Sequence, residues 1–405
     1  MLDRTDVVIL HGARTPMAEY VTGRRGDGQP GGLFKDLSAI DLGAIAAREA
    51  MRRSAVPPER IDHVVMGNAL QTSGDAIYGA RHVGLKAGVP VEVPALTVNR
   101  LCGSGIQSVI SSAQMIRLGE ASTVLAGGME NMSQAPMVIR GAREGFKLGQ
   151  GKLEDLLFVA LLDTHCDLMM AQTAERLAAR YGISRKDQDA YGLRSQEAAA
   201  AAMERGVFRD EIVPVEVKAG RQTMTVDRDD HMKPDTTMEG LAKLPPAFGK
   251  DGTVTAGNAS GIVDGAAALV VADAETARRE GWTPSARIAG WSVCGVPPDV
   301  MGIGPAPAIR RLLEQTGVRL QDIDLFEINE AFAGQYLAVE KELGLDRERV
   351  NVNGGAIALG HPLGATGTRL LLTLIGELGR RGGRYGIASA CIGGGQGIAL
   401  LVERG

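Results

Sequence analysis

Two cysteines in this chain lie beside glycines in a setting that favours thiol chemistry. Cys102 lies in the stretch V-N-R-L-C-G-S-G, between an expected strand at 95–98 and a helical apolar pattern at 106–119. Backbone N–H groups at a helix start lower the pKa of a thiol and can hold an oxyanion. Gly103 and Gly105 leave room for an acyl group. We therefore predict a nucleophile at Cys102, although a lone cysteine is commonly a small buried apolar residue.

Cys391 has a similar surrounding, because it begins the stretch C-I-G-G-G-Q-G. A thiolate can act as a base as well as a nucleophile, so Cys391 is a candidate acid/base, with a core cysteine as the alternative. The remaining cysteines, Cys166 and Cys294, lack a glycine-rich frame and are expected to serve packing. The four cysteines lie far apart without a C-x-x-C pair, which argues against a zinc site and a disulfide framework.

An imidazole and an amide complete the candidate chemistry. His361 lies in the glycine-rich stretch N-G-G-A-I-A-L-G-H-P-L-G-A-T-G, just before an apolar helical stripe that ends at Gly379. Asn329 lies where an expected strand at 325–328 meets an expected helix at 331–343; it could cap that helix, hold a water or substrate carbonyl, or do both. Two thiols, an imidazole and an amide suit acyl transfer through a thioester, with an enolate stabilised by preorganised donors.

The elements that must position these residues indicate an α/β protein. Apolar strands alternate with amphipathic helices at both ends of the chain, which is typical of a mostly parallel sheet. The segment at 266–272 reads as a buried strand or a short helix. The other expected strands are 7–10, 61–66, 124–126 (closed by Gly127-Gly128), 384–388 and 398–402, and the other expected helices include 37–51, 79–88, 171–181, 186–204 and 309–316.

The middle of the chain differs in character from both ends. Between about Glu130 and Gly252, methionine and polar residues increase and short β-rich pieces mix with helices. We therefore predict three parts. Residues 1–129 plus 253–284 form a first α/β half with the nucleophile, residues 130–252 form an inserted loop domain, and residues 285–405 form a second half with Asn329, His361 and Cys391. A cysteine beside a glycine-rich turn in each half hints at a duplicated fold.

Composition restricts the partners. The net charge is −4 and Lys and Arg are scattered, which gives no support to a nucleic-acid or membrane-surface role. No apolar run approaches membrane-spanning length, and the start M-L-D-R-T-D is neither a signal nor a transit peptide. These features and the cysteine pattern predict a cytoplasmic protein. The glycine-rich stretch Gly23 to Gly32 is expected to be a surface loop.

Four motifs in order resemble the signature motifs of the thiolases, the CoA-dependent acyltransferases that make or cleave 3-ketoacyl-CoA. They are V-N-R-L-C-G-S-G around Cys102, N-E-A-F-A from Asn329, G-G-A-I-A-L-G-H-P-L-G-A-T-G around His361 and C-I-G-G-G-Q-G from Cys391. The resemblance runs from Val7 almost to Glu403. It implies a duplicated thiolase-type fold in five layers, α-β-α-β-α, a loop domain that covers CoA, and a homodimer or homotetramer.

The resemblance also implies residue roles. Cys102 would carry the acyl group, and Cys391 would be the acid/base at the α-carbon of acetyl-CoA or at the CoA thiol. His361 would activate Cys102 and, with a water held by Asn329, stabilise the enolate. The N–H groups of Cys102 and Gly393 would form a second oxyanion hole. Coenzyme A and acyl-CoA are implied as substrates, with no permanently bound cofactor and no metal.

Substrate contacts follow from the same resemblance. Ser260, in T-A-G-N-A-S-G, matches the turn that contacts pantetheine. The positions that match the adenine and phosphate region are Lys233, Leu244 and Phe248, and a cation at Lys233 suits a polyanion, although a solvated loop lysine is the alternative. The positions that match the acyl pocket are Met170, Ala331, Phe332 and Met301, although methionine is more often plain packing.

The predicted function is reversible condensation of two acetyl-CoA to acetoacetyl-CoA, or thiolysis of 3-ketoacyl-CoA. One alternative is a broad-chain degradative 3-ketoacyl-CoA thiolase, because Met169 stands where many short-chain biosynthetic members have histidine. Another is a related condensing enzyme, against which the second cysteine, Cys391, argues. A non-catalytic acyl-CoA or lipid-binding protein on the same scaffold would be expected to lose one of the four motifs.

Overall fold

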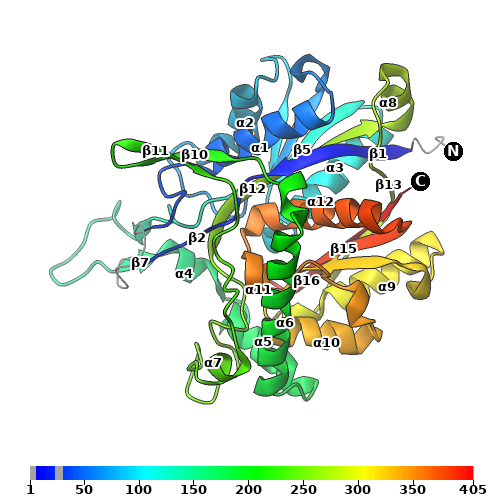
Figure 1. Cartoon of the computed structure of the whole chain (residues 1–405). Coiled ribbons are helices and arrows are strands. Elements are labelled where there is room, and N and C mark those ends of the chain that lie inside the picture. Colours follow the sequence, from blue (N-terminus) through cyan, green and yellow to red (C-terminus); the bar gives the residue numbers. More distant parts are fainter. Residues whose placement is uncertain (1–5, 23–30, 405) are drawn as a thin grey trace.

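Two sheets of similar topology meet at one edge and form the frame of the molecule (Figure 1). The structure is a computed structural model that describes residues 6–22 and 31–404. The first sheet has the order β1-β12-β5-β3-β4 and the second β13-β16-β15-β14, and a short antiparallel β1–β13 contact joins them. Their strands are β1 (Val7–Arg14), β3 (His63–Gly67), β4 (Ala95–Val98), β5 (Thr123–Glu130), β12 (Val263–Asp273), β13 (Ala286–Gly295), β14 (Leu325–Ile328), β15 (Tyr385–Ile392) and β16 (Gln396–Glu403).

The same pairing pattern occurs in both sheets. β3 is parallel to β5, which is antiparallel to β12, and β14 is parallel to β15, which is antiparallel to β16. Gly67 pairs with Gly128 in the first sheet, and Ile328 pairs with Ser389 in the second. Because parallel strands end at the same edge of a sheet, residues that follow these pairs lie close together in each half.

Helices fill the space between the sheets and cover both outer faces. The apolar faces of α3 (Ser104–Arg117) and α12 (Leu363–Arg381) share one core with the inner faces of the two sheets. The outer helices are α1 (Ala39–Arg53) and α2 (Gly79–Ala87) on the first sheet, and α9 (Pro305–Thr316) and α10 (Ala333–Leu343) on the second. The five-layer α-β-α-β-α fold is therefore confirmed.

Short elements between β5 and β12 pack against both halves, with the β10–β11 hairpin on the core of the first half and helices on the second. α5 and α6 pack against α10, and α6 also packs against α11. The helices of this part of the chain are α4 (Leu156–Ala160), α5 (Met170–Arg180), α6 (Arg185–Glu204) and α7 (Met238–Ala242), and α11 (Ala356–Leu359) and α8 (Ala274–Glu280) follow later. The strands of this part form the hairpins β6 (Met137–Ile139) with β7 (Leu153–Asp155), β8 (Leu162–Asp163) with β9 (Leu168–Met169), and β10 (Val215–Ala219) with β11 (Gln222–Val226). The short strand β2 (Ala18–Glu19), near the start of the chain, pairs with β12.

Several expected element ends were wrong. Gly127 and Gly128 do not close a strand, because β5 continues through them to Glu130. A side chain at Gly128 would collide with the carbonyl oxygen of Gly364, so these glycines allow close contact rather than a turn. The stripe after His361 continues to Arg381, beyond Gly379. The segment at 266–272 is a strand within β12.

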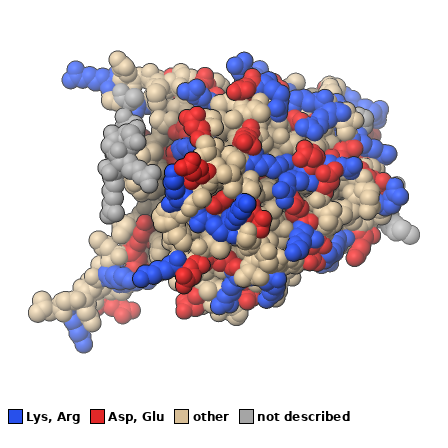
Figure 2. Space-filling model, turned by 60° about the horizontal axis from the view of Figure 1, so that its bottom comes forward, with Lys and Arg blue, Asp and Glu red and all other residues tan. Residues whose placement is uncertain are grey.

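The surface carries both signs of charge. Figure 2 shows Lys and Arg interspersed with Asp and Glu over the face in view. No helix in residues 6–22 and 31–404 is long and apolar enough to cross a membrane. Most of the expected surface loop from Gly23 to Gly32 lies outside the described residues.

Candidate active site

The turn that carries Cys102 is tightly built. Leu101 to Gly103 form one 3-10 turn immediately before α3, and Leu101 has a positive φ of 47°, which is uncommon for a leucine. The Ser104 hydroxyl donates to the Leu101 carbonyl at 2.7 Å and accepts from the Arg100 N–H at 2.8 Å. The turn thus holds the thiol before the first residue of α3, as predicted.

The predicted lowering of the Cys102 pKa was wrong. Burial of the sulfur raises the pKa to about 11, although the N–H groups of Gly393 and of Cys102 itself hydrogen-bond the sulfur and oppose this shift. Desolvation of a thiolate therefore outweighs the two backbone donors in the protein alone. These two N–H groups are the pair for which the resemblance to the thiolases implied an oxyanion hole.

Cys391 lies at the end of β15, next to the same turn. Its pKa is raised by burial and, to a smaller extent, by the nearby Cys102 sulfur. Met301, Ala331 and Cys391 form one buried apolar cluster, and the side chains packed against it are Met170 and Phe332. The second thiol therefore faces an apolar wall beside the first thiol.

The side chains of Asn329 and His361 face each other. Asn329 Nδ2 lies 3.3 Å from His361 Nε2. Asn329 does not cap α10, because that helix begins at Ala333 with Phe332 at its N-cap. This placement leaves the buried Asn329 Oδ1 without a hydrogen-bond partner among the described residues.

Thr366 fixes the orientation of the His361 ring. Its hydroxyl donates to the Pro362 carbonyl at 3.0 Å, so its oxygen can accept from Nδ1 of His361, 2.6 Å away. The proton of the neutral ring then sits on Nδ1, and the lone pair of Nε2 accepts from the Asn329 amide. Burial, followed by the charge of Arg369, lowers the pKa of His361 to about 3, so the ring is neutral near pH 7.

Close helix packing brings the His361 turn to the Cys102 turn. A side chain at Gly105 would lie 2.5 Å from the Thr368 nitrogen, and one at Gly367 would lie 2.3 Å from the Ile106 nitrogen. Such distances are too short for any residue but glycine. The first turns of α3 and α12 therefore touch, each with a candidate catalytic residue just before it.

Three of the predicted CoA contacts lie near the N-E-A-F-A stretch. The Ser260 N–H donates to the Ala331 carbonyl at 3.0 Å, so the Ser260 turn lies along the N-E-A-F-A stretch. Phe248 packs in a cluster with Phe332 and Ala259. Leu244 lies against Gly257 of the same turn.

Lys233 pairs with a carboxylate in the protein alone. Its amino group pairs with Glu19 at 2.8 Å, and Glu19 also contacts His231 at 3.0 Å. Burial raises the pKa of Glu19, but the bonds from His231 and Lys233 outweigh it and lower the pKa to about 2. The cation at Lys233 is thus already paired with a carboxylate, although His231 touches Gly261 beside Ser260.

Three buried polar residues near the site escaped the sequence analysis. Thr366 lies in the same motif as His361, and its hydroxyl within the first helical turn was the sequence feature that could have indicated a contact with the ring. Glu330 follows Asn329 and accepts from Tyr191 at 2.7 Å and Ser195 at 2.6 Å. Glu130 was hidden because the two preceding glycines suggested a strand end.

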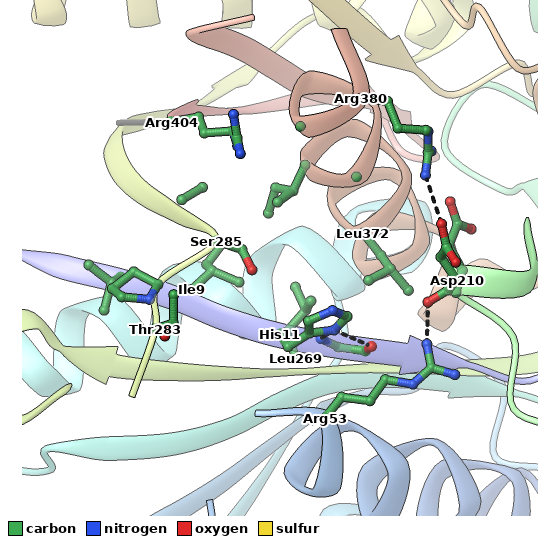
Figure 3. Close-up of a pocket in the computed structure, with 18 of the residues that line it drawn as sticks. Ile9, His11, Arg53, Asp210, Leu269, Thr283, Ser285, Leu372, Arg380 and Arg404 are labelled. Carbon is green, nitrogen blue, oxygen red and sulfur yellow. Dashed lines mark hydrogen bonds and ion pairs between the residues drawn. The ribbon is translucent and has the colours of Figure 1, made fainter. Parts of the chain in front are cut away.

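A cavity of about 1160 Å³ lies elsewhere, beside the C-terminal half of α12 (Figure 3). None of the predicted site residues lines it. Its arginines are largely paired, because Arg380 contacts Asp210 at 3.4 Å and Glu377 at 2.7 Å, and Arg53 contacts Glu49 at 2.7 Å. The candidate active site is therefore where the turns of Cys102, Cys391 and His361 meet, not this open cavity.

Comparisons with known proteins agree with this geometry. The family models "Thiolase, N-terminal domain" and "Thiolase, C-terminal domain" match residues 7–275 and 282–404. The mitochondrial 3-ketoacyl-CoA thiolase of Homo sapiens is 54% identical over 400 residues, which is 98% of each chain.

Solved structures show the same likeness. A crystal structure of human mitochondrial 3-ketoacyl-CoA thiolase in complex with CoA has a TM-score of 0.94 and 53% identity, and the match covers 99% of this chain and 98% of that one. The Bacillus anthracis acetyl-CoA acetyltransferase has a TM-score of 0.95 and 46% identity, and the match covers 100% of both chains. With both family models matched in order over nearly its whole length, the chain belongs to the thiolase family.

Proposed function

We propose that this chain is a CoA-dependent thiolase that cleaves 3-ketoacyl-CoA and runs the reverse Claisen condensation. The observation that carries the proposal is that the Cys102 sulfur lies beside the Gly393 N–H and Cys391, while close packing of α3 against α12 brings the turn of His361, the partner of Asn329, to the Cys102 turn. Relatives named 3-ketoacyl-CoA thiolase and acetyl-CoA acetyltransferase support the reaction class.

Acylation begins with the Cys102 proton. Nε2 of His361 takes this proton, and the thiolate attacks the 3-keto carbon of the substrate. The thiolate and imidazolium form together as a neutral pair, so burial penalises the pair less than either charge alone. The N–H groups of Cys102 and Gly393 stabilise the tetrahedral oxyanion.

Cleavage and release follow. The C2–C3 bond breaks and leaves an acyl group on Cys102, while the electron pair goes to the acetyl-CoA enolate. Cys391 donates its proton to C2 of this enolate. His361 and a water held by Asn329, whose Oδ1 is unpartnered among the described residues, stabilise the enolate oxygen. Cys391 then takes the proton of a CoA thiol, and the CoA thiolate attacks the acyl-Cys102 thioester. The new acyl-CoA forms as the Cys102 thiolate leaves, and this thiolate takes its proton back from His361.

The substrate contacts are part of the proposal. Ser260, Leu244 and Phe248 contact the pantetheine and adenine parts of CoA. Lys233 contacts the phosphates after it exchanges Glu19 for them. The acyl wall is Met170, Met301, Ala331 and Phe332. Thioether and aromatic side chains adapt to aliphatic chains, which favours 3-ketoacyl substrates longer than acetoacetyl-CoA as a second substrate class.

The test is thiolysis with free CoA across 3-ketoacyl-CoA substrates from about four to sixteen carbons, followed by loss of the ketoacyl-CoA absorbance. Cleavage of acetoacetyl-CoA alone would identify an acetyl-CoA acetyltransferase. Cleavage of longer chains would identify a broad 3-ketoacyl-CoA thiolase. Absence of cleavage at every length would overturn the proposal in favour of a non-catalytic acyl-CoA-binding protein.

We further propose a homodimer or homotetramer, which light scattering after size-exclusion chromatography measures directly. The cytoplasmic location expected from the sequence stays a prediction. Fractionation of the source cells, followed by an immunoblot for this chain, tests it.

A further inference from the structure

A buried carboxylate outside the four motifs connects the two catalytic turns. Glu130 is the last residue of β5 and is fully buried. Its Oε1 accepts from Asn68 Nδ2 at 2.8 Å and from the Leu70 N–H at 2.9 Å. Its Oε2 accepts from the Ala69 N–H at 3.0 Å and the Gly364 N–H at 2.8 Å. Both carboxylate oxygens are therefore satisfied by N–H donors.

One branch of this network reaches the imidazole. Gly364 lies in the first turn of α12, three residues after His361. The N-cap residue of α12, Pro362, makes no side-chain capping bond, so Glu130 serves as the acceptor for an N–H group that the helix start leaves free. The negative charge also suits the positive end of the helix dipole.

The other branch reaches the nucleophile. The Ala69 carbonyl accepts from Asn99 Nδ2 at 3.1 Å, and Asn99 Oδ1 accepts from the Leu101 N–H at 2.9 Å. Leu101 precedes Cys102 and carries the positive φ that shapes the turn. An unbroken series of hydrogen bonds and backbone thus runs from the His361 turn through Glu130 to the Cys102 turn.

We propose that Glu130 is a positioning residue for the thiolase reaction, which holds the His361 turn and the Cys102 turn in register across the two halves of the protein. The inference rests on the proposed function for its catalytic meaning. Glu130 touches no reacting atom in this scheme and acts through Gly364 on one side and through Ala69 and Asn99 on the other.

The charge of Glu130 also acts on the nucleophile. Burial is the largest effect on its carboxyl group and raises the pKa to about 7, while the N–H donors of Leu70, Gly364 and Ala69 oppose the shift. The titratable groups that face it are Asp264 of β12, whose charge raises the pKa further, and Cys102. The ionised carboxylate in turn raises the pKa of Cys102. The effect of the charge at position 130 can therefore be tested separately from the effect of the side-chain length.

The experiment compares Glu130→Gln and Glu130→Asp with the wild type. Gln keeps the length but loses the charge and faces two N–H donors with an NH₂ group. Asp keeps the charge but is too short to bridge Ala69 and Gly364. We expect kcat for acetoacetyl-CoA thiolysis to fall about 100-fold in both variants, because small displacements of reacting groups have effects of this size. KM should stay within about threefold, since CoA contacts are not changed.

The second measurement is the pH profile of iodoacetamide alkylation at Cys102, read by mass spectrometry. The midpoint should move to lower pH in Glu130→Gln, where the opposing charge is gone, and should not move down in Glu130→Asp. If Glu130 only stabilised the fold, the alkylation midpoints of the two variants would not differ in this way. The control is Asp264→Asn, which alters another buried carboxylate whose hydrogen bonds go to the N–H groups of Met132 and Ser133 and to neither catalytic turn. The charge of Asp264 raises the pKa of Glu130, so its removal favours the ionised form of Glu130 and leaves the Glu130 side chain in place.

Three results would overturn the inference. They are an unchanged kcat in both Glu130 variants per folded protein, an equal loss of kcat in Asp264→Asn, and an alkylation midpoint that does not respond to Glu130→Gln. A failure of the proposed function looks different, because the wild type itself would then show no thiolysis. The alkylation profile needs no turnover and still decides whether Glu130 acts on the Cys102 turn.

Discussion

The two halves of the molecule use equivalent positions for different purposes. Aligned by strand register, Asn68 after β3 corresponds to Asn329 after β14, since Gly67–Gly128 and Ile328–Ser389 are equivalent pairs. By the same register, Glu130 corresponds to Cys391, two residues beyond each pair. Cys102 and His361 each lie two residues before the first residue of a central helix.

The chemical difference lies in what these residues bind. In the first half Asn68 Nδ2 donates to Glu130 at 2.8 Å, and both carboxylate oxygens of Glu130 accept N–H groups. In the second half Asn329 contacts His361 and keeps a buried Oδ1 without a partner among the described residues, while Cys391 faces an apolar wall. One duplicated framework thus has a closed polar pair in one half and an open, reactive set in the other.

The largest effect is expected at the proposed nucleophile, Cys102, which lies just before the central helix of the first half. Cys102→Ser should lower kcat/KM for thiolysis by about 10⁴-fold or more, because the covalent step is lost. Mass spectrometry after incubation with acetyl-CoA should show no acyl-enzyme. An acylated variant would place the nucleophile elsewhere.

Cys391→Ser should separate the two thiols. Acylation of Cys102 should persist, whereas condensation should fall about 10³-fold, because proton transfer at the α-carbon is lost. Rapid-mix measurement of acyl-enzyme formation beside steady-state condensation distinguishes the steps. Full condensation activity in this variant would contradict the role of Cys391.

A matched pair of asparagine variants tests the comparison itself. Asn329→Ala should lower kcat about 100-fold by removing support for the enolate, with little change in the unfolding midpoint. Asn68→Ala should reduce the free energy of unfolding by about 1–3 kcal/mol, because its amide nitrogen donates to Leu70, Met129 and Glu130.

Urea unfolding of the two asparagine variants measures the change in stability, and steady-state kinetics measures the change in kcat. The contrast is between a stability effect in the first half and a rate effect in the second. If both variants lost stability and neither lost kcat, the two halves would not differ as proposed.

The smallest effect is expected for Thr366→Val. Valine cannot hydrogen-bond to His361 Nδ1, and the loss of this bond raises the activation free energy by about 1 kcal/mol. This increase corresponds to roughly a fivefold lower kcat. Thr366→Ser should keep the hydroxyl and restore the rate. A valine variant with wild-type kcat would show that the hydroxyl does not hold the ring.

Much of the fold was predictable because strand and helix periods are local. The alternation of apolar strands and amphipathic helices gave the α/β class, and the four motifs gave the thiolase-type layers that the structure confirms. Strand ends beside glycines were predicted less well. Gly128 looked like a turn residue, yet its function is to admit the carbonyl of Gly364 from the other half, which no local pattern reveals.

The candidate site, like the fold, was predictable from the sequence in part. The sequence by itself determined which groups are available, since Cys102, Asn329, His361 and Cys391 stand in motifs whose residue types favour acyl transfer. Only the tertiary structure decided their protonation, because burial depends on distant segments; it reversed the expected shift at Cys102 and lowered the pKa of His361 to about 3. Only the tertiary structure, too, brought Glu130 between the two turns, because its four N–H partners come from Asn68 to Leu70 and from Gly364, segments that are far apart in the chain.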